Sequence, residues 1–148
     1  LAWSSAMSAS TDIERATGLL ESQVDAPERP FFTNSLFIEL FNAAFDEHNL
    51  ENKEDAFHLM HTARQLLLDY QEYDPYKRDV QINLFRTEIL LANWGQTDFT
   101  EQAVHRAERI FKLYPAYLSM LQIVADDMRF VGRDDLADEY NARINAAR

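Results

Sequence analysis

The chain has no cysteine and little glycine or proline, and each of these features narrows the choice of fold and chemistry. Without cysteine, disulfides and thiolate metal sites are excluded. Three Gly and four Pro in 148 residues leave long uninterrupted segments, which favours helices over strand-and-turn architectures. No apolar run reaches the roughly 18 residues that a membrane-spanning helix needs. We therefore expect a helical domain that is not itself inserted in a membrane.

Basic residues are also scarce, since 14 Lys and Arg stand against 25 Asp and Glu, for a net charge of -11. A protein that binds a nucleic-acid duplex needs cations to replace the counterions of the phosphates, and an anionic membrane surface repels an acidic protein. The composition therefore predicts no nucleic-acid partner. The simplest role for the surplus of acidic residues is solubility.

Apolar residues recur at helical spacing in seven segments, and no segment has a convincing strand pattern. Short loops between the segments make neighbouring helices antiparallel. The predicted fold class is all-α, with one helical domain over residues 11–148. Residues 1–10 are predicted to be a disordered leader or the end of a preceding segment. The predicted helices span residues 12–24, 34–48, 54–70 or beyond, 79–93, 100–113, 116–131 and 134 to about 146.

Proline, glycine and capping residues predict where several of these helices begin and end. Pro30 is expected to lie between the first two helices, with Asn34 or the residue before it capping the second. Gly95 and Gly132 are expected to end helices, and Gly132 should have a positive φ. Asp134 is the predicted cap of the last helix. The start at Leu1 rather than Met suggests the hypothesis that the chain is part of a longer protein.

The C-terminal half contains an internal repeat that appears when Pro75 is aligned with Pro115, 40 residues later. A pair of helices that buries one face leaves a second apolar stripe bare, and a following pair can cover it. The repeat therefore predicts stacked helical hairpins. Beyond the first helix the offset falls from 40 to 34 residues, because six surplus residues fit in the loop from Trp94 to Phe99. The residues that correspond in kind are the pairs Leu84 and Val124, Ala103 and Ala137, and Ile110 and Ile144.

One segment has the spacing of the second helix and terminal proline of the tetratricopeptide repeat family: Ala103-x3-Ala107-x2-Ile110-x4-Pro115. Residues 116–144 have the spacing of one further repeat. The chain therefore resembles this family over residues 75–146. It departs from the family pattern at four positions. The family prefers Trp where this chain has Gln81, Gly or Ala where it has Phe85, Tyr where it has Glu88, and an aromatic residue where it has Asn141.

The resemblance implies a short superhelix whose concave groove, lined by the first helix of each pair, holds a peptide or a partner protein. It implies a non-enzymatic domain without a cofactor or a metal. A mixture of apolar and charged groups can grip an extended peptide. The family's groove positions fall on eight residues of this chain: Asp79, Ile82, Arg86, Ile89, Ser119, Gln122, Asp126 and Arg129.

A second resemblance concerns the order of an isolated repeat, a long helix ending at Asp74-Pro75, and Asn83-Leu84 in the next helix. This order is similar to that in the soluble C-terminal region of some bacterial O-antigen polymerase or ligase family membrane proteins. The resemblance implies an extracytoplasmic domain tethered to a membrane protein of envelope polysaccharide assembly. The residues themselves leave the compartment open.

Two alternative hypotheses come from the residues. His58 and His61 lie three apart on one predicted helix with Glu54 a turn before, so a helical bundle with metal-binding or enzymatic function is the second hypothesis. Nothing else in the sequence forms a recognisable metal motif, and solvated histidines are the simpler interpretation. The third hypothesis is a homodimer that buries an exposed apolar stripe. No glycine-rich phosphate loop or nucleophile-elbow motif occurs, and we predict no enzyme.

Overall fold

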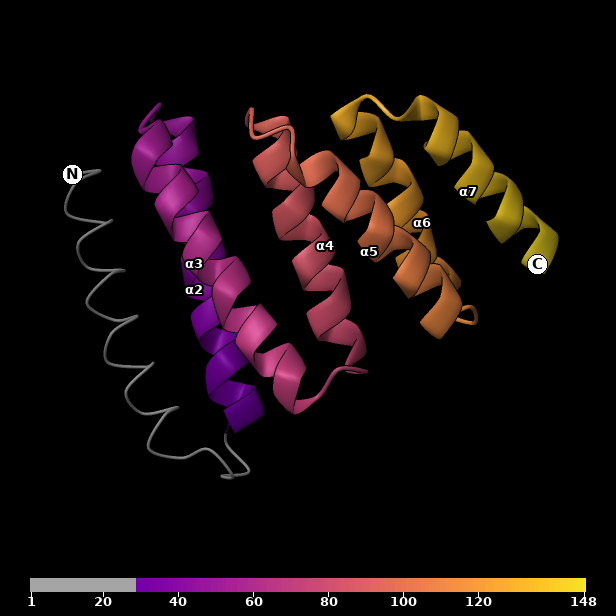
Figure 1. The fold of residues 1–148 in the computed structure, drawn as a ribbon, viewed down its shortest axis with the longest axis horizontal. Coiled ribbons are helices and arrows are strands. Elements are labelled where there is room, and N and C mark those ends of the chain that lie inside the picture. The colour runs from indigo at the N-terminus through magenta and orange to yellow at the C-terminus, as the bar shows by residue number, and fades with distance from the viewer. Residues whose placement is uncertain (1–28) are drawn as a thin grey trace. The chain divides into compact units, whose positions relative to one another are not determined.

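The computed structural model describes residues 29–148, which fall into two compact units divided between Glu72 and Tyr73 (Figure 1). Every regular element of these residues is a helix, and none of them is a strand. The all-α fold class predicted from the periodicity is therefore confirmed. The predicted leader at residues 1–10 and the predicted helix at 12–24 lie outside the described residues.

The first unit contains α2 (Arg29–Asn49) and α3 (Lys53–Tyr73), whose last residue is already in the second unit. A three-residue turn joins the two helices, so they run antiparallel. The turn is closed by Asn52, whose backbone N–H donates to the Glu47 carbonyl at 2.9 Å and whose side-chain amide donates to the Glu47 carboxylate at 2.8 Å. The apolar residues that are buried on the two helices are Leu36, Phe37, Leu40, Ala44, Ala56, Leu59, Met60, Ala63, Leu67 and Tyr70.

The second unit consists of two helical hairpins. The first pairs α4 (Arg78–Asn93) with α5 (Phe99–Leu113), and the second pairs α6 (Leu118–Asp127) with α7 (Asp134–Ala147). A short 3₁₀ helix, η1 (Met128–Val131), continues α6 and contacts α4 and α7. Because α6 also contacts α4 and α5, the two hairpins pack against each other in one unit (Figure 1).

The core of the second unit is built from residues that the internal repeat places in equivalent positions. All six members of the three aligned pairs, Leu84 with Val124 and the two alanine and isoleucine pairs, are at most 1% exposed. Alanines on α5, α6 and α7 occupy places where a larger side chain would hold the helices apart. Five of the six aligned residues, all except Leu84, belong to the main cluster of the core. The cluster also contains Phe85, Ile89, Ala107, Met120, Leu121, Ala125, Met128 and Tyr140.

Several predicted helix ends are wrong by a few residues. α2 begins at Arg29 rather than at Asn34, and Pro30 lies in its first turn, where backbone N–H groups have no helical acceptor and proline is tolerated. The predicted sixth helix begins at Leu118 rather than at residue 116, and its last turn tightens into η1. Asp134 is the first residue of α7 and not its cap. Gly132 has a φ of +74°, as predicted.

Candidate functional site

The predicted groove residues lie on α4, α6 and η1, and most of them reach the surface. Five are exposed and two are partly exposed, whereas Ile89 is 3% exposed and belongs to the core. Ile89 therefore offers almost no surface to a partner. The exposed residues are Asp79, Arg86, Ser119, Asp126 and Arg129, and the partly exposed ones are Ile82 and Gln122.

Two of these residues are engaged by α7. The Gln122 side-chain amide donates to Oδ1 of Asn141 at 2.7 Å and to Oδ1 of Asp126 at 2.9 Å. The Arg129 guanidinium lies 2.8 Å from Oδ1 of Asp138 and forms a further ion pair in the first turn of α7. These contacts hold α6 and η1 against α7, so the Gln122 and Arg129 side chains are less available to a ligand.

A different part of α6 and η1 presents apolar surface beside α4. Ile123 is 38% exposed and Phe130 is 64% exposed, and their spacing of seven positions places both on one helical face. The side-chain amide of Asn93, the last residue of α4, donates to the Phe130 carbonyl at 2.9 Å. This bond holds η1 against the end of α4.

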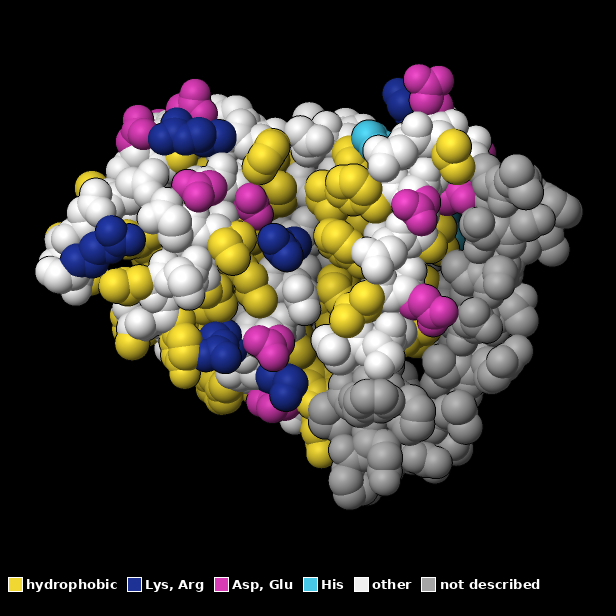
Figure 2. All heavy atoms as spheres, turned by 180° about the vertical axis from the view of Figure 1, so that it is seen from behind, with side chains coloured by type: hydrophobic (Ala, Val, Ile, Leu, Met, Phe, Trp, Pro, Cys, Tyr) yellow, Lys and Arg dark blue, Asp and Glu magenta, His cyan; other side chains and the backbone are white. Residues whose placement is uncertain are grey.

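Charged residues of α4 and α6 accompany these apolar side chains. Burial raises the pKa of the Asp127 carboxyl, and the nearby Arg86 guanidinium offsets part of that rise. We call Arg86, Ile123, Asp127 and Phe130 the α4–η1 surface. Figure 2 views the molecule from behind, and on the second unit it shows hydrophobic side chains interrupted by single basic and acidic ones.

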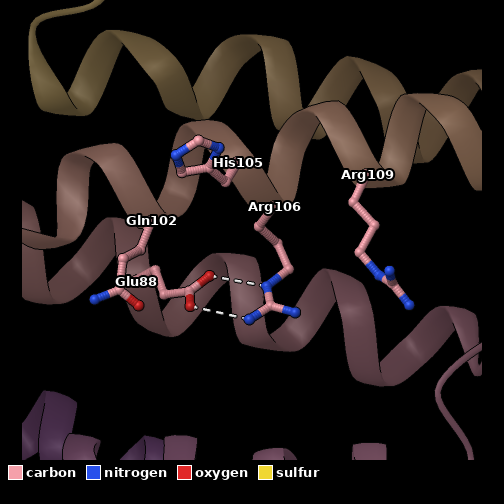
Figure 3. Close-up of a pocket in the computed structure, with 5 residues that line it drawn as sticks. All are labelled: Glu88, Gln102, His105, Arg106 and Arg109. Atoms are coloured by element: carbon pink, nitrogen blue, oxygen red, sulfur yellow. Dashed lines mark hydrogen bonds and ion pairs between the residues drawn. The ribbon is translucent and has the colours of Figure 1, made fainter.

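A second feature is a hollow of about 300 Å³ beside α4 and α5 (Figure 3). Its lining residues from α5 share one helical face, because they are three, four and seven positions apart. Only one lining residue comes from α4. The residues that line the hollow are Glu88, Gln102, His105, Arg106 and Arg109.

Arg106 connects two buried polar side chains of α4. Its Nε and Nη2 donate to the two carboxylate oxygens of Glu88 at 3.0 and 3.2 Å, and its Nη1 donates to Oε1 of Gln81 at 2.9 Å. Glu88 and Gln81 are both fully buried. The helical pattern predicts that Arg106 points outward with the other cations of its helix. This prediction is wrong, because only 12% of the Arg106 side chain is exposed.

Within the second unit, the residues that precede α4 are held by side chains of α4 and α5 and by Tyr114. The Pro75 carbonyl accepts hydrogen bonds from the Gln81 amide at 3.3 Å and from Arg109 Nη2 at 3.1 Å. The Tyr114 hydroxyl donates to the Tyr76 carbonyl at 2.6 Å. Arg109 therefore has a defined position at the edge of the hollow.

The second hypothesis, a metal site at His58 and His61, gains no third ligand. Within residues 29–148, no three His, Cys, Asp or Glu side chains gather closely enough to hold a metal ion. His58 is exposed to solvent. No helix in the same part of the chain is sufficiently long and apolar to cross a membrane.

Comparison of the whole chain with protein-family models, with curated proteins and with solved structures found no match.

Proposed function

We propose that this chain is a non-enzymatic interaction domain that resembles tetratricopeptide repeats and binds a peptide or partner protein on its α4–η1 surface. The observation that carries the proposal is the exposure of Phe130 and Ile123 on one face of α6 and η1. Asp127, which lies between these two residues in the sequence, has the Arg86 guanidinium nearby. A solvent-exposed phenylalanine beside a second apolar side chain is typical of an anchor point in an interface.

The surface also supplies both signs of charge, which favours a peptide with mixed character. Arg86 is exposed on α4, whereas Asp127 is partly buried on α6. An extended peptide with an apolar side chain for Phe130 and a carboxylate for Arg86 matches this arrangement. Because few residues contribute, we expect modest affinity.

Selection from a peptide display library tests the proposal. We expect the wild-type protein to enrich peptides that a Phe130→Ser variant does not retain. A Tyr117→Ser variant is the matched control, because Tyr117 is a 48% exposed aromatic residue that precedes α6, at the opposite end from η1. Failure to enrich any sequence, or equal retention by the Phe130→Ser variant, would contradict the proposal.

The competing hypothesis is a homodimer that buries the same apolar side chains, Ile123 and Phe130. Light scattering over a concentration series distinguishes the two. A dimer in the wild type that becomes a monomer in the Phe130→Ser variant would assign this surface to self-association instead.

For the biological setting, we propose a soluble part of a larger bacterial protein of envelope polysaccharide assembly. Support comes from the similarity in element order to the C-terminal region of O-antigen polymerase or ligase family proteins. The full gene sequence tests this setting. Membrane spans encoded directly upstream of Leu1 would support this setting. A preceding segment without membrane spans would contradict it.

A further inference from the structure

The hollow on α5 is left without a role by the proposed function, which concerns the α4–η1 surface. It combines a volume of about 300 Å³ with two arginines, a histidine and a glutamine on one helical face. In a chain with a net charge of -11, a hollow rich in cationic side chains is a local reversal of sign. Such a site attracts an anion, which the rest of the surface repels.

Of the charged side chains among residues 29–148 that line the hollow, Arg109 is the one available to bind a ligand. Glu88 is fully buried, and Arg106 occupies both of its carboxylate oxygens, so this carboxylate is neutralised and inaccessible. Arg109 has no acidic partner among the described residues and uses one N–H on the Pro75 carbonyl. A guanidinium carries five N–H donors, so most donors of Arg109 remain for a ligand.

The geometry also reduces the entropy that binding would cost. Figure 3 shows the Arg106 and Arg109 side chains leaving α5 next to each other and extending toward α4. Arg106 is held by Glu88 and Gln81, and Arg109 is held by the turn before α4. A guanidinium that is already positioned loses less freedom when it binds a planar anion.

We propose that this hollow binds a small organic carboxylate, with Arg109 as the principal cation and the Gln102 amide and the His105 ring as neighbouring polar groups. A planar carboxylate fits the fork of a guanidinium in a bidentate manner. A volume near 300 Å³ is at the small end of ligand sites, which suits an acid of a few carbon atoms. A single available guanidinium balances one carboxylate better than a doubly charged phosphate.

The same chemistry is available from two sources, a free carboxylic acid or the carboxylate of an acidic peptide. Isothermal titration calorimetry at low salt separates them with three probes: butyrate, an N-acetylated and C-amidated Gly-Glu-Gly peptide, which carries one carboxylate, and inorganic phosphate. We expect saturable binding of butyrate or of the peptide, and weaker binding of phosphate. Binding of butyrate indicates a metabolite site, and binding of the peptide alone indicates a site for a protein side chain.

Two matched variants show whether Arg109 carries the binding. Arg109→Gln should weaken the affinity for the carboxylate at least about tenfold, which is the effect expected from losing one charge-assisted hydrogen bond. Lys112→Gln removes the same charge from the same helix but does not line the hollow, so its effect should stay below about twofold. Thermal unfolding of each variant shows whether the fold is retained, and His105→Ala provides a second test that leaves the Pro75 contact in place.

Three results would overturn the proposal. These are no saturable binding of either carboxylate by the wild type, equal losses in Arg109→Gln and Lys112→Gln, or tighter binding of phosphate than of both carboxylates. None of these results bears on peptide binding at Phe130, because the hollow and the α4–η1 surface share no residue.

Discussion

The guanidinium of Arg106 on α5 and the carboxylate of Glu88 on α4 form a bidentate ion pair, with N–O distances of 3.0 and 3.2 Å, and the carboxylate is fully buried. Arg106 also reaches Gln81, seven residues before Glu88 on the same face of α4. Gln81 and Glu88 are two of the positions at which the chain departs from the tetratricopeptide pattern. The hairpin of α4 and α5 therefore has a polar contact where that family prefers aromatic residues.

Removing Arg106 should destabilise the protein strongly. In an Arg106→Met variant Glu88 loses a bidentate partner while it remains buried, and breaking such a pair costs about 3–5 kcal/mol in the free energy of unfolding. Urea unfolding followed by circular dichroism measures the loss. A double variant, Arg106→Met with Glu88→Met, should recover most of it, because an apolar pair needs no charge compensation.

A surface pair in the same unit is the control. Arg143 on α7 also makes two hydrogen bonds to one carboxylate, that of Glu108, but both side chains are more than 40% exposed. Arg143→Met should therefore cost only about 0–1 kcal/mol. Equal losses in the Arg106 and Arg143 variants would show that the burial of Glu88 has no energetic consequence.

The protein should lose stability in alkaline solution because of Tyr140. Its hydroxyl donates to Oε1 of Glu108 at 3.0 Å, and burial, followed by this hydrogen bond, raises the pKa of Tyr140 well above its usual range. The folded protein thus keeps a proton that the unfolded chain loses above about pH 10. This contribution to stability is fully present below about pH 10 and declines as the pH rises above it.

Tyr140→Phe separates the two effects of the hydroxyl. We expect the variant to lose about 1 kcal/mol at pH 7 from the missing hydrogen bond. It should also show a smaller decline between pH 9 and 11 than the wild type, as measured by thermal unfolding at several pH values. An identical decline in both proteins would assign the alkaline sensitivity to other groups.

Substitution of Gly132 should destabilise the protein because of the backbone conformation at this position, not because of steric contacts. Its φ is +74°, and a Cβ added there would meet no atom within 4 Å. Gly132→Ala should therefore cost about 1 kcal/mol from the left-handed conformation alone. Gly132→Asn should cost less, because asparagine tolerates this region better. A loss larger for Asn than for Ala in the unfolding midpoint would contradict a purely conformational cause.

Charge reversal in the predicted groove tests whether its residues are dispensable for folding. Arg86 and Arg129 are both exposed, so Arg86→Glu and Arg129→Glu should keep the helical circular-dichroism signal. Arg129→Glu should lose somewhat more stability than Arg86→Glu, because it places a third acidic group beside Asp134 and Asp138. Collapse of the helical signal in either variant would show that the register of α4 or η1 is wrong.

The helices could be predicted from the sequence because their stability comes from apolar faces, and apolar spacing is visible in the residues. The aligned pairs, such as Leu84 and Val124, are buried for this reason. The start of α2 could not be predicted, because Pro30 fits equally well in a first helical turn and in a loop. The tightening at η1 could not be predicted either. Met128 in this segment is buried in the core cluster and η1 contacts α4 and α7, and local sequence does not reveal these contacts.

The polar contact of Arg106 was missed because its helix shows an amphipathic pattern that assigns arginine to the outside. A signal existed on α4, where Gln81 and Glu88 fall on the face of buried Leu84. Two polar residues on a buried face require hydrogen-bond partners. The sequence does not say which residue supplies them. The α4–η1 surface was missed for a related reason, since the family register selects Arg129 rather than Phe130.

The most direct test of the central claim is calorimetric titration of one selected peptide into three proteins: the wild type, Phe130→Ser and Tyr117→Ser. The account predicts that Phe130→Ser weakens the affinity at least about tenfold, as expected for an interface anchor, and that Tyr117→Ser changes it less than about twofold. Equal affinities for all three proteins, with helical content unchanged, would show that the peptide binds elsewhere and would contradict the claim.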